Sequence, residues 1–286
     1  MDYDTLFLTP GGINGYSLFG SIHVLEKLNI FDSFKRYIGI SVGSIISFLL
    51  ILKYKSNEIF KILASENIED MYFNSEFDNH NVILNLIKHF GMSNATGIDK
   101  LFSLFLKERQ LNINITFKEL YEYNNIEFIV IASNITKSKL EYFSYKLTPN
   151  VSVLLAVKGS SAIPIIFNPI KYNNNLLVDG GFYNNFPNKY ITNKTLTIRL
   201  KNKKNSNAGD VLSYIKLLFN SLSEQIITDN KYHTIELLCD ESGVNFNINN
   251  HYKNNLYNCG IIEAQKFVKW KFFLLKIFNT WKNLNK

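Results

Sequence analysis

Cysteine is scarce in this sequence, and no apolar segment has the length of a membrane span or of a signal-peptide core. The two cysteines, Cys239 and Cys259, are too few for a disulfide framework and lack the spacing of metal ligands. The longest uncharged run, residues 37–52, is short for a bilayer crossing, and the apolar residues 5–8 are too few for export. We therefore expect an intracellular, cytoplasmic protein with reduced thiols, no metal site and no transmembrane segment.

The sequence also lacks a Pro/Gly/Ser-rich linker, so we expect a single domain over residues 1–286. Its 46% of hydrophobic and 19% of charged residues indicate a globular protein. The net charge of +7 favours anionic partners, but no arginine-rich run or aromatic–basic stripe points to nucleic acid. An anionic lipid surface would account for the charge equally well.

A glycine-flanked serine lies within the most apolar part of the chain. The β-branched, apolar residues up to Ile40 run through Gly39-Ile40-Ser41-Val42-Gly43 into the apolar residues 45–52. This pattern predicts a strand, a sharp turn and a buried helix, which together form a nucleophile elbow. A Cβ at Gly39 or Gly43 would strike the neighbouring strand or helix, and Ser41 would stand at the helix N-terminus, where negative charge is favoured.

Two further glycine motifs also follow predicted strands. Residues 5–9 form the first strand, which leads into Pro10-Gly11-Gly12-Ile13-Asn14-Gly15 and then into a helix over 16–28. Consecutive glycine N–H groups at a helix start can hold a phosphate or the oxyanion of a tetrahedral intermediate. Strands at 170–172 and 176–178 lead to Asp179-Gly180-Gly181, and an α/β architecture places catalytic groups at such a strand end.

The rest of the chain predicts mainly packing elements. Helices are expected at 56–69, 81–90, 98–108, 116–124, 149–157 and 210–226, strands at 126–132, 140–145, 196–200 and 234–238, and a tight turn at 158–164. The last 25 residues are basic and amphipathic, and residues 262–284 would form a helix with one apolar stripe. That stripe either docks on its own domain or seats the protein on an anionic membrane.

The order of the three glycine motifs resembles the patatin-like phospholipases, which carry a glycine-rich oxyanion loop, a Gly-x-Ser-x-Gly nucleophile and an Asp-Gly-Gly aspartate. The resemblance extends to Ser160-Ser161-Ala162-Ile163-Pro164 and covers about residues 5–190, leaving a C-terminal extension over about 191–286. It implies a three-layer α/β/α fold with a mainly parallel central sheet and helices on both faces.

The resemblance also implies a lipid acyl hydrolase that cleaves esters of phospholipids or lysophospholipids at a membrane surface, with no metal and no organic cofactor. Ser41 would be the nucleophile and Asp179 the proton acceptor, so histidine would take no part. Backbone N–H groups would form the oxyanion hole, and glycines would complete the motifs. The oxyanion residues are Gly11, Gly12 and Ile13, and the motif glycines are Gly15, Gly39, Gly43, Gly180 and Gly181.

Two positions of the glycine loop differ from the family pattern. Pro10 stands where the family has its first glycine and supplies no N–H, and Asn14 stands where a basic residue is common. Two alternatives therefore stay open. One is a lipid-binding protein that has lost catalysis. The other is an α/β-hydrolase triad, because His233 and His251 both follow Asp179 in the chain.

Overall fold

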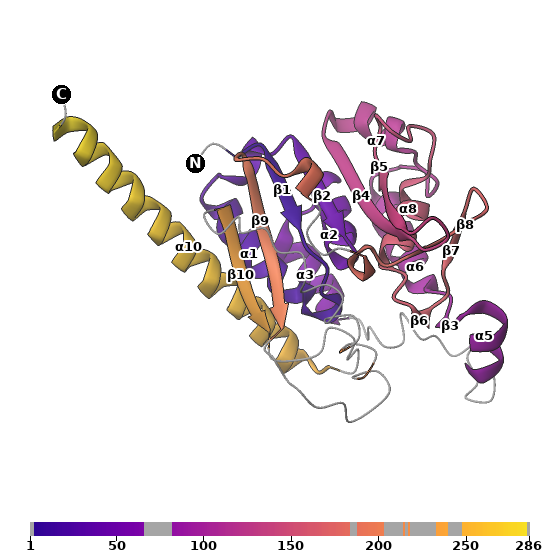
Figure 1. Cartoon of the computed structure of the whole chain (residues 1–286). Helices are drawn as coiled ribbons and strands as arrows, with labels where there is room; N and C mark the ends of the chain where they lie inside the picture. Colours follow the sequence, from indigo (N-terminus) through magenta and orange to yellow (C-terminus); the bar gives the residue numbers. More distant parts are fainter. Residues whose placement is uncertain are drawn as a thin grey trace.

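The computed structural model describes residues 3–65, 82–183, 188–202, 214, 217, 233–239 and 248–284, and its centre is an eight-stranded sheet (Figure 1). The strand order is β10 (Thr234–Cys239), β9 (Thr195–Asn202), β1 (Thr5–Leu8), β2 (Arg36–Ile40), β4 (Glu127–Asn134), β8 (Asn175–Val178) and β7 (Ile170–Tyr172), with β5 (Lys139–Phe143) also paired to β4. The strands from β10 to β4 are parallel. Strands β5 and β8 pair antiparallel with β4, and β7 pairs antiparallel with β8. Because the strands from β10 to β4 are all parallel to one another, the prediction of a mainly parallel sheet is confirmed.

The described residues also form eight α-helices. They are α1 (Tyr16–Lys27), α2 (Val42–Ile51), α3 (Ser56–Ser65), α5 (Val82–His89), α6 (Thr96–Glu108), α7 (Phe117–Asn124), α8 (Val153–Ser161) and α10 (Asn250–Leu284). Helix α7 begins with a capping box, in which Thr116 and Glu119 satisfy each other's backbone N–H groups. None of the described helices combines the length and the apolar composition needed to cross a bilayer.

The two faces of the sheet carry separate apolar clusters because side chains alternate along each strand. Leu6, Leu8 and Phe128 belong to the large cluster that the described helices cover. The opposite face has a smaller cluster of Phe7, Ile38, Ile40, Ile129 and Ile131, packed against side chains of β5 and residues 190–191. The helix predicted at 210–226 lies outside the described residues, except for residues 214 and 217.

Helix α10 is longer than the sequence predicts, because it begins at Asn250 and not at residue 262. Its N-terminal half lies against α1, where Gly20 faces the Tyr257 carbonyl and Gly260 faces the Ser17 carbonyl so closely that a Cβ would overlap either oxygen. The Ser21 hydroxyl also donates to the Gly260 carbonyl over 3.0 Å. The helix is docked by these contacts, and its C-terminal half continues past the body of the protein (Figure 1).

The helix predicted at 149–157 is present but lies four residues later, since α8 spans Val153–Ser161. The turn predicted at 158–164 is wrong over residues 158–161, because α8 includes these small residues. Those residues are small because the helix lies close to the sheet, where a Cβ at Gly159 would come within 3.0 Å of the Leu177 side chain. Tight packing and a tight turn select the same residue types, so the composition alone did not separate them. The prediction also missed a small parallel pair, β3 (Gly91–Ser93) and β6 (Ile165–Phe167).

Candidate active site

Ser41 occupies the turn between β2 and α2 in a backbone conformation that side-chain-bearing residues rarely adopt, with φ 53° and ψ −128°. Both flanking glycines are needed for this turn. A Cβ at Gly39 would overlap the backbone of Ser44 in α2, and a Cβ at Gly43 would overlap the Leu8 carbonyl of β1. The steric reason predicted for the two glycines is therefore confirmed.

The register of the sheet brings Ser41 and Asp179 to opposite sides of the same residue. Ile40 of β2 pairs with Ile131, and Val178 of β8 pairs with Ser133, so the residues that follow, Ser41 and Asp179, both flank Ala132 of β4. Strand β8 runs antiparallel to β4, whereas the expectation for Asp179 rested on parallel strands ending at one edge. The two side chains are thus brought together by the opposed directions of β2 and β8.

Asp179 is buried, and its surroundings change its acidity. Its backbone N–H donates to the Ala162 carbonyl over 2.8 Å, and its Oδ1 accepts the Gly181 N–H over 2.8 Å. Burial raises the pKa of the carboxyl from 3.8 to about 6, while hydrogen bonds from the Ser41 hydroxyl and the Gly181 N–H act in the opposite direction. At neutral pH the carboxylate is therefore ionised but far more basic than an exposed aspartate.

Ser160 supports the nucleophile turn, and the sequence reasoning missed this role. The backbone N–H of Ser41 donates to the Ser160 hydroxyl over 2.9 Å, and that hydroxyl donates to the Ile131 carbonyl over 2.6 Å. The side chain thus satisfies two buried backbone groups and ties the strained turn to β4. The available signal was the Ser-Ser pair within the motif 160–164, which had been interpreted as a turn.

The glycine loop lies beside Ser41. Residues Gly12–Gly15 form a short 3₁₀ helix, Gly12 has a φ of 55°, and the Asn14 N–H donates to the Gly11 carbonyl over 3.1 Å. A Cβ at Gly15 would overlap the Val42 side chain, so this glycine lets the loop approach α2. Asn14 is fully buried, and its carbonyl accepts the Ser17 hydroxyl over 2.7 Å.

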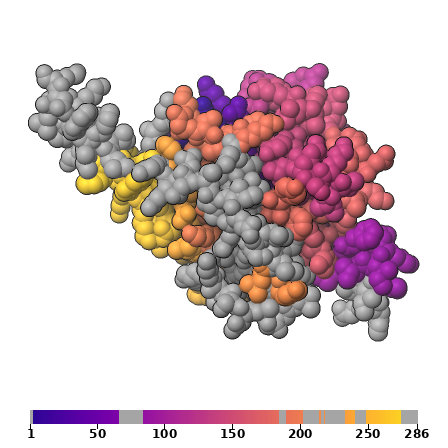
Figure 2. Space-filling model, viewed as in Figure 1, coloured from indigo at the N-terminus to yellow at the C-terminus, as the bar shows by residue number. Residues whose placement is uncertain are grey.

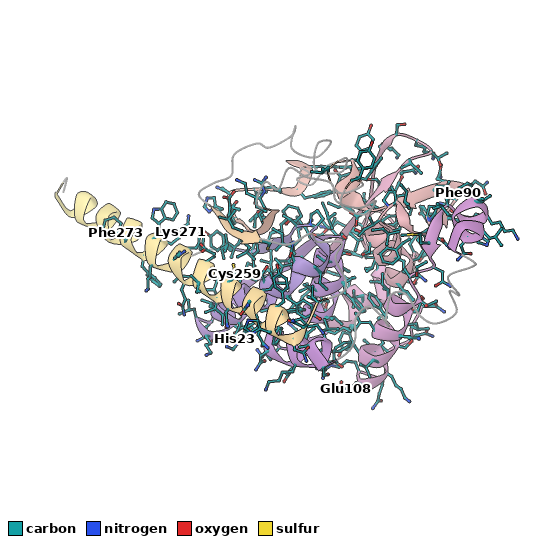
Figure 3. The ribbon with its side chains drawn as sticks, turned by 90° about the horizontal axis from the view of Figure 1, so that it is seen from below. His23, Phe90, Glu108, Cys259, Lys271 and Phe273 are labelled. Carbon is teal, nitrogen blue, oxygen red and sulfur yellow. The ribbon has the colours of Figure 1, made fainter. Side chains whose placement is uncertain are left out.

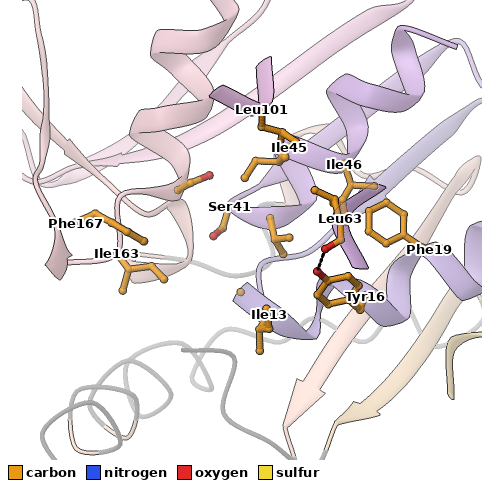
Figure 4. A pocket seen from close by; sticks show the side chains of 14 residues that line it. Ile13, Tyr16, Phe19, Ser41, Ile45, Ile46, Leu63, Leu101, Ile163 and Phe167 are labelled. Carbon is orange, nitrogen blue, oxygen red and sulfur yellow. Dashed lines mark hydrogen bonds between the residues drawn. The ribbon is translucent and has the colours of Figure 1, made fainter. Parts of the chain in front are cut away.

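An apolar cavity of about 70 Å³ opens at Ser41 (Figure 4). Ser41 lies between Ile13 and Tyr16 on one side and Ile163 and Phe167 on the other. The remaining lining residues come from the glycine loop and from helices α1, α2, α3, α6 and α8: Gly12, Gly15, Phe19, Val42, Ile45, Ile46, Leu63, Leu101 and Ser161. Ser41, the glycine loop and an apolar surface therefore share one cavity.

The two histidines of the alternative triad lie away from this cavity. The His233 ring contacts the Tyr3 hydroxyl at 3.2 Å where β10 begins, at the edge of the parallel strands opposite to Ser41. His251 is exposed in the first turn of α10, and neither residue lines the cavity. Within the described ranges, no three His, Cys, Asp or Glu side chains gather as ligands of a metal ion.

Curated relatives and solved structures resemble this chain over most of its length. The probable lipid hydrolase 463L of Invertebrate iridescent virus 6 is 35% identical over 242 residues, which cover 82% of this chain and 77% of that protein. The uncharacterized protein R571 of Acanthamoeba polyphaga mimivirus is 26% identical and covers 90% of both chains. VipD from Legionella pneumophila has a TM-score of 0.65 at 16% identity and covers 94% of this chain and 67% of its own, so it shares the fold.

ExoU of Pseudomonas aeruginosa, solved in its complex with SpcU, has the same fold, with a TM-score of 0.53 at 14% identity over 94% of this chain and 51% of its own. Residues 6–190 match the family described as patatin-like phospholipase, which is more than half of the chain. This match and the 35% identity to the viral relative show that the protein belongs to the patatin-like phospholipase family.

Proposed function

We propose that the protein hydrolyses fatty-acyl esters of phospholipids or lysophospholipids through Ser41 and Asp179. The observation that supports this most is the register of the sheet, which sets the strained Ser41 and the buried Asp179 on the two sides of Ala132. The neighbouring cavity is lined mainly by apolar side chains, and the methylene groups of an acyl chain are more favourably placed against such a lining than in water. The viral relative's name, probable lipid hydrolase, agrees with this substrate class.

In the proposed reaction the Ser41 hydroxyl attacks the ester carbonyl while Asp179 accepts its proton. An aspartate with an ordinary pKa is a poor base for an alcohol. Burial raises the pKa of Asp179 to about 6, which makes its carboxylate a stronger base. Asp179 then gives the proton to the departing alcohol. Water hydrolyses the acyl-serine in a second cycle of the same transfers, which restores both groups.

The backbone N–H groups of the glycine loop would stabilise the oxyanion. Gly12 and Ile13 line the cavity together with Ser41, and Gly11 directly precedes them. Each such donor is worth roughly 2.7 to 4 kcal/mol of transition-state stabilisation. Pro10 contributes no donor, so the proposal places this role on Gly11, Gly12 and, to a smaller extent, Ile13.

A substrate panel tests the proposed class. Purified protein is incubated with vesicles of phosphatidylcholine, lysophosphatidylcholine or triacylglycerol, and the released fatty acid and the remaining lipid are measured by mass spectrometry. We expect release from the phospholipid, the lysophospholipid or both, because an apolar cavity opens beside the proposed nucleophile. Binding to these vesicles without release of fatty acid would instead support a lipid-binding protein that has lost catalysis.

The C-terminal half of α10 is the part of the molecule that we propose to touch the membrane. Ala264, Phe267 and Val268 are buried against the body, whereas Phe272 and Phe273 are 56% and 61% exposed. Phe273 lies on the segment of α10 that extends past the body, beyond Cys259 and close to Lys271 (Figure 3). Exposed aromatic rings beside lysines are typical of helices that lie at an anionic lipid surface.

Replacing Phe272 and Phe273 together by serine should weaken binding to vesicles that contain phosphatidylserine by about tenfold or more, since each phenylalanine loses its burial in the interface. Hydrolysis of a soluble short-chain ester should not change, because both side chains already face solvent. Co-sedimentation with vesicles and a chromogenic ester assay measure the two effects. A truncation after Glu263 would not separate them, because it removes buried residues of α10.

The matched control is the double replacement of Leu104 and Leu147 by serine. These leucines are 54% and 50% exposed and lie on α6 and in the turn after β5. Figure 2 shows α10, in yellow, on the opposite side of the molecule from the magenta middle of the chain. The control should bind vesicles as the wild type does. Equal losses in both double variants, or unchanged binding of the Phe272/Phe273 variant, would show that α10 does not seat the protein on the membrane.

A further inference from the structure

Two neighbouring serines in the last turn of α8 differ sharply in their surroundings. The Ser160 hydroxyl is fully used, because it accepts the Ser41 N–H and donates to the Ile131 carbonyl. The Ser161 hydroxyl has no hydrogen-bond partner among the residues that the structure describes, although Ser161 is only 6% exposed. A buried hydroxyl without a partner costs free energy, so its presence requires a reason.

The place of Ser161 supplies that reason. Ser161 lines the cavity that opens at Ser41, and all the other side chains lining that cavity, apart from Ser41 and the Tyr16 hydroxyl, are apolar or absent. The Tyr16 hydroxyl is already engaged, since it donates to the Leu63 carbonyl over 2.8 Å. Apart from Ser41, the Ser161 hydroxyl is thus the polar side-chain group of this lining that can hydrogen-bond a substrate. Rotation about its single side-chain torsion would direct it at an entering ester.

The wall that carries Ser161 lies on the Asp179 side of the nucleophile. The residue after Ser161, Ala162, accepts the Asp179 backbone N–H over 2.8 Å, while the glycine loop approaches Ser41 from another wall. In the tetrahedral intermediate the oxyanion turns to the glycine loop, and the alcohol-side oxygen turns to the group that must protonate it. The alcohol-side oxygen therefore comes within reach of Ser161.

We propose that the Ser161 hydroxyl donates a hydrogen bond to the alcohol-side oxygen of the ester as that oxygen departs. This inference rests on the proposed hydrolysis by Ser41 and Asp179 and names one more residue that contacts the substrate. The bond from Ser41 Oγ to the carbonyl carbon forms, and the bond from that carbon to the alcohol oxygen breaks. The leaving oxygen receives the proton that Asp179 took from Ser41, and Ser161 keeps its own proton throughout.

The test compares two esters of one fatty acid, an alkyl ester and a p-nitrophenyl ester, with Ser161→Ala. An alkoxide is a strong base and needs stabilisation as it leaves, whereas nitrophenolate leaves with little help. We expect kcat/KM to fall about 10- to 100-fold on the alkyl ester and less than about threefold on the nitrophenyl ester. The thermal unfolding temperature should stay unchanged or rise, because the variant removes a buried hydroxyl without a partner.

Ser47→Ala is the matched control, because Ser47 is also a fully buried serine whose hydroxyl has no partner among the described residues, but it lies in α2 outside the cavity. This variant should keep both activities. Ser161→Cys, which keeps the shape of the side chain with a somewhat larger atom and weakens the donor, should reproduce the selective loss if Ser161→Ala does not fold.

The outcomes separate this inference from the proposed function. Equal losses on the two esters, or no loss on either, would overturn the contact with the alcohol-side oxygen even if hydrolysis by Ser41 stands. Activity that is the same in wild type and Ser41→Ala would instead remove the proposed function itself. A selective loss on the alkyl ester, with a retained unfolding transition, supports both.

Discussion

Ser41→Ala should lower kcat/KM for ester hydrolysis by about 10⁴-fold or more and leave the thermal unfolding transition close to that of the wild type. The variant removes the only atom proposed to form the acyl bond, and the activity that remains would come from binding and the oxyanion hole. Folding should change little because the Ser41 backbone contacts persist. The N–H still reaches Ser160 and the carbonyl still accepts the Ser44 N–H over 2.8 Å. Steady-state kinetics and thermal denaturation measure the two quantities.

The histidine variants give the control for this result. His233→Ala combined with His251→Ala should retain kcat/KM within about tenfold, whereas loss of the general base of a triad costs several powers of ten. His233 contacts Tyr3 at the opposite edge of the parallel strands, and His251 faces solvent. A thousandfold loss in a folded histidine variant would favour the triad, and full turnover by Ser41→Ala would show that another group attacks the ester.

Much of the site could be predicted from the sequence because its geometry depends on local backbone sterics. Gly39, Ser41 and Gly43 lie within one turn, so an apolar strand, a small-residue turn and an apolar helix predict the elbow without knowledge of the rest of the fold. The structure confirms these elements as β2, the Ser41 turn and α2. The same holds for β1 and for the glycine loop after it, although the sequence did not predict that Gly12–Gly15 form a short 3₁₀ helix.

What could not be predicted depends on residues distant in the sequence. The Ser160 hydroxyl accepts the backbone N–H of Ser41, which is 119 positions away in the sequence. Only the packing of α8 on β4 reveals that contact. The early part of α10 likewise packs on α1, where Gly20 faces the Tyr257 carbonyl and Gly260 faces the Ser17 carbonyl, so that the two helix backbones approach closely. The direction of β8 is set by its pairing with β4, so the sequence located Asp179 at a strand end but not the direction of that strand.

The assignment of Ser41 as nucleophile, of Asp179 as base and of the glycine loop as oxyanion hole rests on the geometry and on the family, and kinetics must test it. The resemblance to the family also includes Asn184-Asn185-Phe186-Pro187 and Gly243-Val244, and these residues lie outside the described ranges.

The electrostatic cost of the site leads to the last prediction, in which Asp179→Asn lowers activity and raises stability at the same time. Without a base, kcat/KM should fall to about the level of Ser41→Ala, and combining the two substitutions should add little, since the two residues act as a unit. The wild-type kcat/KM should fall with a slope of one proton below about pH 6, because a protonated Asp179 cannot accept the Ser41 proton.

The sign of the stability effect follows from the raised pKa of Asp179. At pH values between 3.8, the ordinary pKa of an aspartate, and about 6, the Asp179 carboxyl of the folded protein holds its proton while that of the unfolded chain loses it. The stabilising contribution of the protonated group is therefore complete below pH 3.8 and is lost as the pH rises through 6. Above that pH the ionised, buried carboxylate costs roughly 3 kcal/mol, from two pKa units at about 1.4 kcal/mol each.

Asparagine carries no charge, and its Oδ1 can still accept the Gly181 N–H, so the variant avoids this cost without losing that bond. Asp179→Asn should therefore unfold several degrees above the wild type at pH 8, and the difference should disappear near pH 4. Denaturation at a series of pH values measures the gap, with Asp99→Asn as a control because that aspartate is partly exposed and paired with Lys158. A variant that is inactive and equally stable at every pH would keep Asp179 as the base but exclude a buried, strongly perturbed carboxylate.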